Sequence, residues 1–178
     1  MSGQLSLLAE PGFDCSADAL RDCWATPPRL FDALHRDYFF TIDCCALAWN
    51  AKLPRYWTPE QDGLRQRWAG ETIWCNPPYS NIEPWVAQAY NSRGEATTVM
   101  LLPARVDTWW WCSFAPHANE HCWFRGRPRF VPPPGVEASS GPFERFVLLR
   151  FGPRPRECAR PTQRVRDPET GLIVLTGA

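Results

Sequence analysis

The sequence predicts a single-domain α/β protein with a mostly parallel central sheet and an antiparallel hairpin toward the C-terminus. Its 178 residues fit one domain. A continuous β-favouring run at 96–102 is typical of a strand buried on both faces, as in parallel sheets. Helices are predicted to begin near residues 26 and 84, between candidate strands. Two further strands, at 121–124 and 143–151, are joined by an exposed loop and complete the hairpin.

Residues 22–152 form the predicted folded domain, flanked by two segments of different composition. Residues 1–21 are polar and interrupted by Pro11-Gly12, so we expect a loose lead-in. Residues 153–178 alternate proline, arginine and polar residues, which predicts a Pro/Arg-rich and largely disordered tail. Its apolar pentapeptide 171–175 either adds an edge strand or has no structural role. No stretch approaches the ~20 apolar residues of a membrane span, so we expect a cytoplasmic protein without membrane association.

The eight cysteines contain no Cys-x2-Cys pair, which favours reduced, mostly buried thiols over a disulfide framework or a metal site. No metal is therefore expected. The formal net charge is zero, but residues 1–120 hold 9 basic and 14 acidic residues, whereas residues 121–166 hold 10 arginines and 3 glutamates. This late positive segment suits a polyanionic partner, although a preference for arginine codons explains part of the arginine count.

A short β-favouring run, Thr72–Cys75, is followed by Asn76 and two prolines. Because proline lacks an N–H and fixes φ, the strand must stop at Asn76. The rigid tip that follows holds the Asn76 amide, the Pro77 carbonyl and the Tyr79 ring at one end of the sheet. Two acceptors beside a flat ring can hold and stack a planar substrate through its exocyclic amino group, and adenine has such a group.

Two other predicted strands end near polar residues. The apolar run Tyr38–Ile42 is predicted to be a buried parallel strand that ends at Asp43, and the strand at 96–102 leads into Arg105. Open α/β sheets bind ligands at the carboxyl ends of their parallel strands. We therefore expect Asp43, Asn76 and Arg105 on the same rim of the sheet, with a role as a helix cap as the alternative for Asp43.

The tetrapeptide Asn76-Pro77-Pro78-Tyr79 is accompanied by further motifs along the chain. They are Asp22–Pro27, Ile42–Ala46 with Asn50–Lys52, Thr58–Leu64 and Leu101–Trp109. Through these motifs, residues 22–152 resemble the small phage-type DNA N6-adenine methyltransferases, the Dam-like family. The resemblance implies a Rossmann-like methyltransferase fold, S-adenosyl-L-methionine as cofactor, and methyl transfer to the N6 amino group of adenine in DNA. The adenine would be flipped out of the duplex and stacked on Tyr79.

The resemblance also assigns roles to individual residues. Its catalytic motif corresponds to Asn76, Pro77, Pro78 and Tyr79. The cofactor-binding residues that it implies are Thr26, Pro27, Asp43, Cys44, Ala46, Asp62 and Asn76. The glycine-rich turn usual in methyltransferases is absent after Asp43, where small residues replace it only in part. A helix cap at Thr26 and a turn at Asp62 are the alternatives.

DNA contacts are expected from Arg105 and from a proline-stiffened loop with Arg125, Arg127 and Arg129, with a merely solvated loop as the alternative. Three consecutive indoles, Trp109–Trp111, cannot share one helix face, so at least one should be exposed or meet a partner. Two other functions stay open, namely methylation of a protein glutamine amide or an RNA base, and a non-catalytic nucleic-acid-binding module with this fold. The sequence indicates neither a recognition site nor an oligomeric state.

Overall fold

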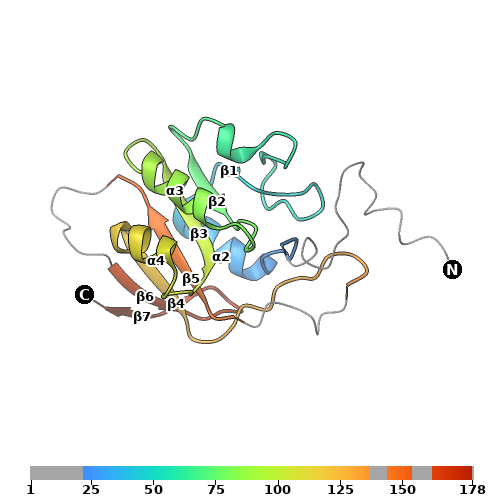
Figure 1. The fold of residues 1–178 in the computed structure, drawn as a ribbon. Coiled ribbons are helices and arrows are strands. Elements are labelled where there is room, and N and C mark those ends of the chain that lie inside the picture. The colour runs from blue at the N-terminus through green and yellow to red at the C-terminus, as the bar shows by residue number, and fades with distance from the viewer. Residues whose placement is uncertain (1–21, 137–143, 154–161, 178) are drawn as a thin grey trace.

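A seven-stranded sheet crosses the domain in the order β1-β2-β3-β5-β4-β6-β7 (Figure 1). The structure is a computed structural model, and it describes residues 22–136, 144–153 and 162–177. The strands are β1 Ile42–Asp43, β2 Thr72–Cys75, β3 Thr97–Pro103, β4 Glu120–Phe124, β5 Phe146–Phe151, β6 Thr162–Arg166 and β7 Ile173–Gly177. The helices are α2 Pro28–Tyr38, α3 Glu83–Ser92 and α4 Trp109–Phe114, with short 3-10 turns η2 Gly63–Arg65 and η3 Ala115–His117.

The sheet is mixed, so the prediction of a mostly parallel sheet was wrong, while the α/β class is confirmed. Strand β2 pairs in parallel with β1 and with β3, and β4 pairs in parallel with β6. The pairs β3·β5, β4·β5 and β6·β7 are antiparallel. The two strands of the expected hairpin, β4 and β5, do pair with each other. Because β5 returns directly beside β3, it ends the parallel part of the sheet after three strands.

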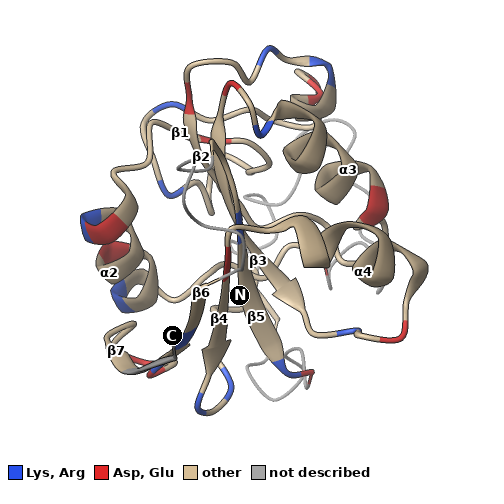
Figure 2. Ribbon diagram, turned by 90° about the vertical axis from the view of Figure 1, so that its left-hand side faces the viewer, with Lys and Arg blue, Asp and Glu red and all other residues tan. Residues whose placement is uncertain are grey.

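Helices cover both faces of the sheet, with α2 on one side and α3 and α4 on the other (Figure 2). Side chains alternate between the two cores along β2, β3 and β5, as the pleat requires. The core under α2 includes Leu30, Phe31, Leu34, Trp74, Val99, Leu101, Phe146 and Leu148. The opposite core includes Ile73, Cys75, Trp85, Val86, Met100, Leu102, Val147 and Leu149. Burial of each large aliphatic side chain stabilises the folded state by about 1.5–3 kcal/mol. This packing holds the strands in place, and with them the polar residues at the strand ends.

The strand β1 is shorter than the sequence predicts, because Tyr38 belongs to the helix α2 and not to the strand. The helix continues to Tyr38, and Phe39 then turns the chain in the left-handed region, with φ 54° and a side chain that is 74% exposed. Only Ile42 and Asp43 remain in the strand, so the strand expected from Tyr38 onward was wrong at its start. The Tyr38 hydroxyl donates to Glu120 Oε1 at 2.8 Å, a contact that holds this residue at the helix end.

The C-terminal segment adds two strands, which differs from the expectation of a largely disordered tail. Strand β6 pairs with β4, and β7 forms the edge of the sheet. The fully buried Arg166 donates to Asp37 Oδ2 and to the Gly171 carbonyl, both at 2.6 Å. The expected lead-in, 1–21, and residues 154–161 of the tail lie outside the described residues. Among the described helices, none has the length and apolar character needed to cross a membrane.

Candidate active site

The tip after β2 fixes the orientation of the Asn76 amide. Strand β2 ends at Cys75, as the prolines require. The Asn76 Nδ2 group donates to the Trp24 carbonyl at 3.2 Å, and the Tyr79 hydroxyl donates to Asn76 Oδ1 at 2.6 Å. Burial raises the pKa of Tyr79 well above its usual range, so the phenol stays protonated and remains a donor. The Asn76 oxygen is thereby held in place and keeps a lone pair for a second donor.

Contacts from two sides hold the rest of this tip. The Asp22 carboxylate accepts hydrogen bonds from the Ser80 backbone N–H at 3.0 Å and from the Ser80 hydroxyl. Arg105 Nη1 donates to the Tyr79 carbonyl at 3.1 Å. The half-buried Tyr79 ring packs against Phe146 and, edge-on, against Phe130, with centroids 5.5 and 6.4 Å away. The motif is therefore rigid before any ligand arrives.

A hollow of about 290 Å³, including space open to solvent, lies beside the tip. Its walls are formed by Asp22, Ala25, Thr26, Asp43, Cys45, Asn50, Lys52, Trp74 and Asn76. Strands β1 and β2 are parallel neighbours, so their carboxyl ends bring Asp43 and Asn76 to the same rim, as predicted. Thr26 joins them from the segment before α2. Three of the predicted site residues therefore meet in one pocket.

Two buried oxygen atoms in this pocket have no hydrogen-bond partner among the described residues, Asp43 Oδ1 and Thr26 Oγ1. The other oxygen of Asp43 accepts from the Lys52 backbone N–H at 3.1 Å. Burial, followed by the nearby charge of Cys45, raises the pKa of Asp43 to about 7 against the opposing hydrogen bonds from the Lys52 and Cys45 backbone. Thr26 does not cap α2, because the N-cap is Pro27. Buried oxygens of this kind mark a place where a ligand can donate hydrogen bonds.

Four predicted cofactor-binding residues do not line the pocket. Pro27 occupies the N-cap of α2, Cys44 is fully buried in the core, and the Ala46 backbone N–H donates to the Trp57 carbonyl at 3.0 Å. Asp62 adopts φ 50° and accepts from the Leu64 backbone N–H at 3.2 Å. The turn alternative for Asp62 is thus confirmed, and the cofactor roles of all four residues stay predictions.

The glycine that follows Asp62 lets the chain approach the end of β1. A Cβ atom at Gly63 would lie 2.1 Å from the Cys44 carbonyl oxygen, far inside any real contact. The Gly63 carbonyl accepts from the indole N–H of the buried Trp68 at 2.9 Å. The turn 62–63 therefore packs its backbone directly against the backbone of Cys44, the residue after β1.

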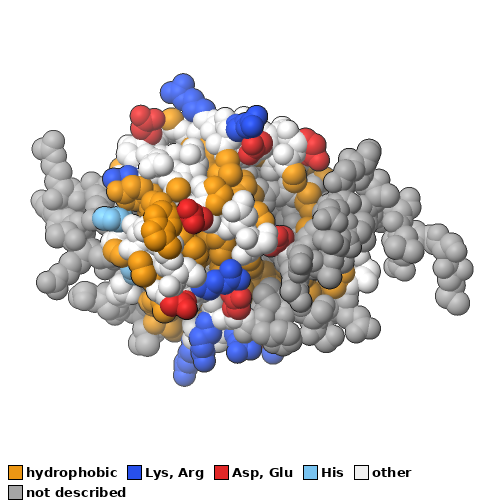
Figure 3. Space-filling model, in the orientation of Figure 1, with side chains coloured by type: hydrophobic (Ala, Val, Ile, Leu, Met, Phe, Trp, Pro, Cys, Tyr) orange, Lys and Arg blue, Asp and Glu red, His pale blue; other side chains and the backbone are white. Residues whose placement is uncertain are grey.

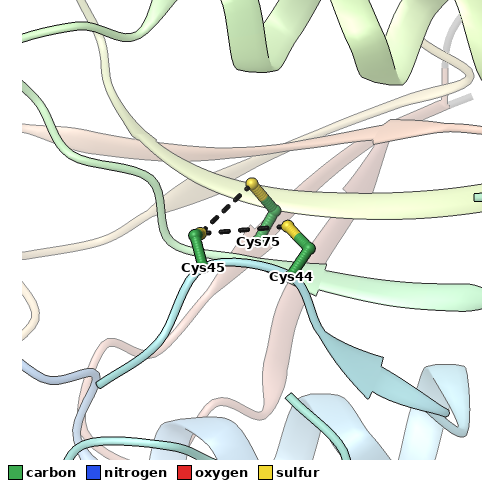
Figure 4. Close-up of side chains that lie close together, drawn as sticks. All are labelled: Cys44, Cys45 and Cys75. Carbon is green, nitrogen blue, oxygen red and sulfur yellow. Dashed lines mark hydrogen bonds between the residues drawn. The ribbon is translucent and has the colours of Figure 1, made fainter. Parts of the chain in front are cut away.

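Behind the pocket, the thiols of Cys44, Cys45 and Cys75 lie together (Figure 4). Burial raises the pKa of Cys44 and of Cys75 well above the usual range. Burial also raises the pKa of Cys45, but hydrogen bonds from the Cys44 and Cys75 thiols and from the Asn76 backbone N–H outweigh it and lower the value to about 5. Cys45 is therefore the one thiol of the three whose pKa is lowered, and it accepts a hydrogen bond from the backbone of the central motif.

The predicted DNA-contacting arginines fall into two groups. Arg105 forms a two-point ion pair with Glu144, with distances of 2.8 and 3.1 Å, and Arg129 lies 3.3 Å from Glu169. Arg125 and Arg127 are exposed and form no ion pair with a described residue. In Figure 3, Lys and Arg side chains gather mainly toward the top and the bottom of the face shown, and hydrophobic side chains form much of the area between them.

The three consecutive indoles behave as predicted. The Trp109 side chain is 63% exposed, whereas Trp110 is 6% exposed and packs in the core beside α3. Trp109 begins α4, shortly after Arg105 in the loop that leaves β3. An exposed indole therefore begins the helix that follows the loop whose Arg105 contacts the Asn76–Tyr79 tip.

Residues 15–164 match the protein family described as DNA N-6-adenine-methyltransferase (Dam). The chain belongs to this family. It is 38% identical over 105 residues to a DNA N-6-adenine-methyltransferase of Haemophilus phage HP1 (strain HP1c1), a match that covers 56% of this chain and 60% of that protein. It is 30% identical over 109 residues to a DNA N-6-adenine-methyltransferase of Escherichia phage T1, covering 60% and 46% respectively. The chain thus spans about half the length of the relatives it matches.

Several pocket residues of this Dam-family chain were not predicted from the sequence. They are Asp22, Ala25, Cys45, Asn50, Lys52 and Trp74. Five of them lie inside or beside the segments 22–27, 42–46 and 50–52, which carry the family resemblance, so that resemblance could have pointed to them. Asn50 has a visible structural role, because its Oδ1 accepts from the Leu47 backbone N–H at 2.8 Å and shapes the loop.

Proposed function

We propose that this Dam-family chain is a methyltransferase with a Rossmann-like fold that uses S-adenosyl-L-methionine to methylate the N6 amino group of adenine in DNA. One observation carries the proposal. The Asn76 amide, held by the Trp24 carbonyl at its nitrogen and by the Tyr79 hydroxyl at its oxygen, borders the same pocket in which Asp43 and Thr26 present buried oxygens without partners among the described residues. An acceptor for a substrate amine and acceptors for a cofactor are thus adjacent.

The pocket residues fit the proposed cofactor. Its ribose hydroxyls and amino groups are hydrogen-bond donors, and Asp43 Oδ1 and Thr26 Oγ1 are buried atoms that can accept from them. An ionised Asp43 also attracts a cation. When bound, the cofactor supplies a methyl group activated by its sulfonium. The carboxyl ends of the parallel strands β1 and β2 provide the ligand site common in open α/β sheets.

The residues of the tip prepare the amino group for transfer. The nitrogen of adenine is a weak nucleophile because its lone pair is delocalised into the ring. Asn76 Oδ1 accepts one N–H of this group and the Pro77 carbonyl accepts the other, which draws the nitrogen toward tetrahedral geometry and directs its lone pair into the pocket. The rate then comes from positioning and electrostatics, and the rigid Pro77-Pro78 segment supplies the positioning.

DNA is the proposed substrate, and its adenine must leave the duplex to reach Asn76. Tyr79 serves as the stacking platform in this proposal, although its ring already packs against Phe130 and Phe146, so it offers the base only its remaining surface. Arg125 and Arg127 are exposed for phosphate contacts. Arg105 pairs with Glu144 and Arg129 with Glu169, so each must release its glutamate before it can contact a phosphate.

The test is transfer of labelled methyl groups from S-adenosyl-L-methionine to unmethylated DNA, followed by digestion to nucleosides. We expect the label in N6-methyldeoxyadenosine. Parallel reactions contain RNA or a protein mixture in place of DNA. If only one of these were labelled, the substrate would be RNA or protein and not DNA. Calorimetric titration of the cofactor is run on the same sample, and absence of binding would indicate a non-catalytic nucleic-acid-binding module.

A further inference from the structure

Three cysteine sulfurs meet where β1 and β2 end. Cys44 and Cys45 follow β1, and Cys75 is the last residue of the neighbouring parallel strand β2. Cys45 Sγ lies 3.8 Å from Cys44 Sγ and 3.8 Å from Cys75 Sγ, and all three sulfurs lie within 4.8 Å of one another. Figure 4 shows the side chains converging from the two strand ends.

We propose that Cys44, Cys45 and Cys75 bind one thiophilic d10 cation, zinc(II) or copper(I), through their three sulfur atoms. Zinc–sulfur bonds of about 2.3 Å at tetrahedral angles place the sulfurs about 3.8 Å apart. Two of the three spacings already have this value. Thiolates are also the ligands that select copper(I) and zinc over harder cations, whereas calcium and magnesium require oxygen ligands, and the described group consists of three sulfurs.

Buried thiols in simple contact would show the same spacing. The accessibility of the three cysteines therefore provides a second observation. Cys44 and Cys75 are fully buried, but Cys45 is half-buried and lines the pocket, which gives a cation an entry path.

The site is hidden from sequence spacing because its ligands come from two strands. Adjacent cysteines at 44 and 45 are a poor metal motif alone, and Cys75 follows 30 residues later. Only the parallel pairing of β1 with β2 brings them together. Metal binding at this site does not depend on the proposed methyl transfer, so the two can fail separately.

The experiment titrates the full-length, reduced protein with cadmium(II) without oxygen, as a spectroscopic probe for zinc-type binding. We expect a thiolate-to-metal charge-transfer band that saturates at one equivalent. A second titration with copper(I) against a chromophoric competitor distinguishes the two cations. Cys45→Ser and Cys75→Ala should weaken binding by more than the roughly 10- to 100-fold typical of removing a group that only supports a ligand. Cys112→Ser, at an exposed cysteine of α4, should bind like the wild type.

A second measurement on the wild-type protein removes any dependence on the folding of the variants. Cys45 is accessible from the pocket, so it should be alkylated by iodoacetamide and protected when cadmium(II) is present, as read by peptide mass spectrometry. The proposal is overturned if no one-equivalent band forms, if the two cluster variants bind like the wild type, or if cadmium(II) leaves the labelling of Cys45 unchanged.

Discussion

Buried polar groups are treated in opposite ways at the pocket rim and at the C-terminal side of the sheet. At the rim, Asp43 Oδ1 and Thr26 Oγ1 have no partner among the described residues. Near β6, Arg166 is 1% exposed, yet both of its terminal nitrogens donate at 2.6 Å and only its Nε lacks a partner. A buried group left without a hydrogen bond costs about 1–3 kcal/mol. At the rim, the unpaired oxygens lower the stability of the fold but can bind a ligand. Near β6, the paired groups stabilise the fold instead.

The largest expected effect comes from removing the acceptor at the rim. Asn76→Ala should lower the rate of methyl transfer on the order of 10²- to 10³-fold, the loss typical of removing one preorganised polar group from an active site. Cofactor affinity, measured by calorimetry, should change little, because Asp43 and Thr26 are untouched. Full activity of this variant in the DNA assay would remove Asn76 from the chemistry.

The matched substitution on the far side should act on stability instead. Arg166→Met removes the donors to Asp37 and to the Gly171 carbonyl, so the free energy of unfolding should fall by about 2 kcal/mol in urea. The rate of methyl transfer at low temperature should stay that of the wild type. Arg129→Ala, which breaks an exposed ion pair with Glu169, is the control and should cost less than about 1 kcal/mol. If Arg166→Met lost activity while its free energy of unfolding stayed that of the wild type, the proposed difference between the pocket rim and the C-terminal side of the sheet would be wrong.

Cofactor binding should depend on pH through Asp43. With a pKa of about 7, this carboxyl is mainly protonated at pH 6 and mainly ionised at pH 8. Because the ionised form accepts hydrogen bonds and attracts a cation, the affinity for S-adenosyl-L-methionine should rise up to about tenfold over this range. Asp43→Asn supplies the baseline, since it lacks this ionisation, and its calorimetric profile should be flatter. Identical profiles would show that Asp43 does not titrate at the site.

A smaller effect is expected from the hydroxyl that orients Asn76. Tyr79→Phe removes the donor to Asn76 Oδ1 and keeps the ring that packs against Phe130 and Phe146. The activation free energy of methyl transfer should rise by about 1 kcal/mol, the usual net value of one hydrogen bond, so transfer becomes slower. KM for DNA should stay nearly constant. A change confined to KM would instead assign the hydroxyl to substrate binding.

The smallest effect is expected at the exposed arginines. Arg127→Ala should reduce the salt dependence of DNA binding by about one phosphate contact, with a modest loss of affinity. Arg127→Lys keeps the charge and should retain the slope. Arg129→Ala should change the slope less, because its guanidinium already pairs with Glu169. Fluorescence anisotropy at several salt concentrations measures all three, and equal slopes for wild type and Arg127→Ala would exclude this contact.

The elements best predicted from the sequence are those set by local chemistry. Two prolines after Asn76 stop β2 wherever the chain folds, and the long β-favouring run at 97–103 has no helical alternative. The apolar run at 38–42 lacks such a constraint. There, Tyr38 completes a helix whose buried residues Leu30 and Leu34 already face the sheet, and the same composition fits either structure.

Long-range pairing explains the other differences. The composition of 162–166 predicts disorder, yet these residues pair in parallel with β4 and bury Arg166 against Asp37, a partner 129 residues away. Likewise, Asp43 and Asn76 could be placed on one rim from the strand ends, but the contact of Cys45 with Cys75 depends on register. The cofactor assignments at Pro27, Cys44, Ala46 and Asp62 rest on resemblance and stay predictions.

The close approach of Gly63 to Cys44 limits which substitutions this part of the chain can accept during evolution. A hydrogen atom is the largest group that fits between residue 63 and the Cys44 carbonyl, so two stretches of main chain are in direct contact next to the end of β1. Side chains that line the pocket can vary and alter what is admitted, whereas this contact between peptide groups leaves no room for a side chain. Variants that broaden the range of accepted ligands should therefore arise at the mouth, and changes at residue 63 should be lost as failures to fold.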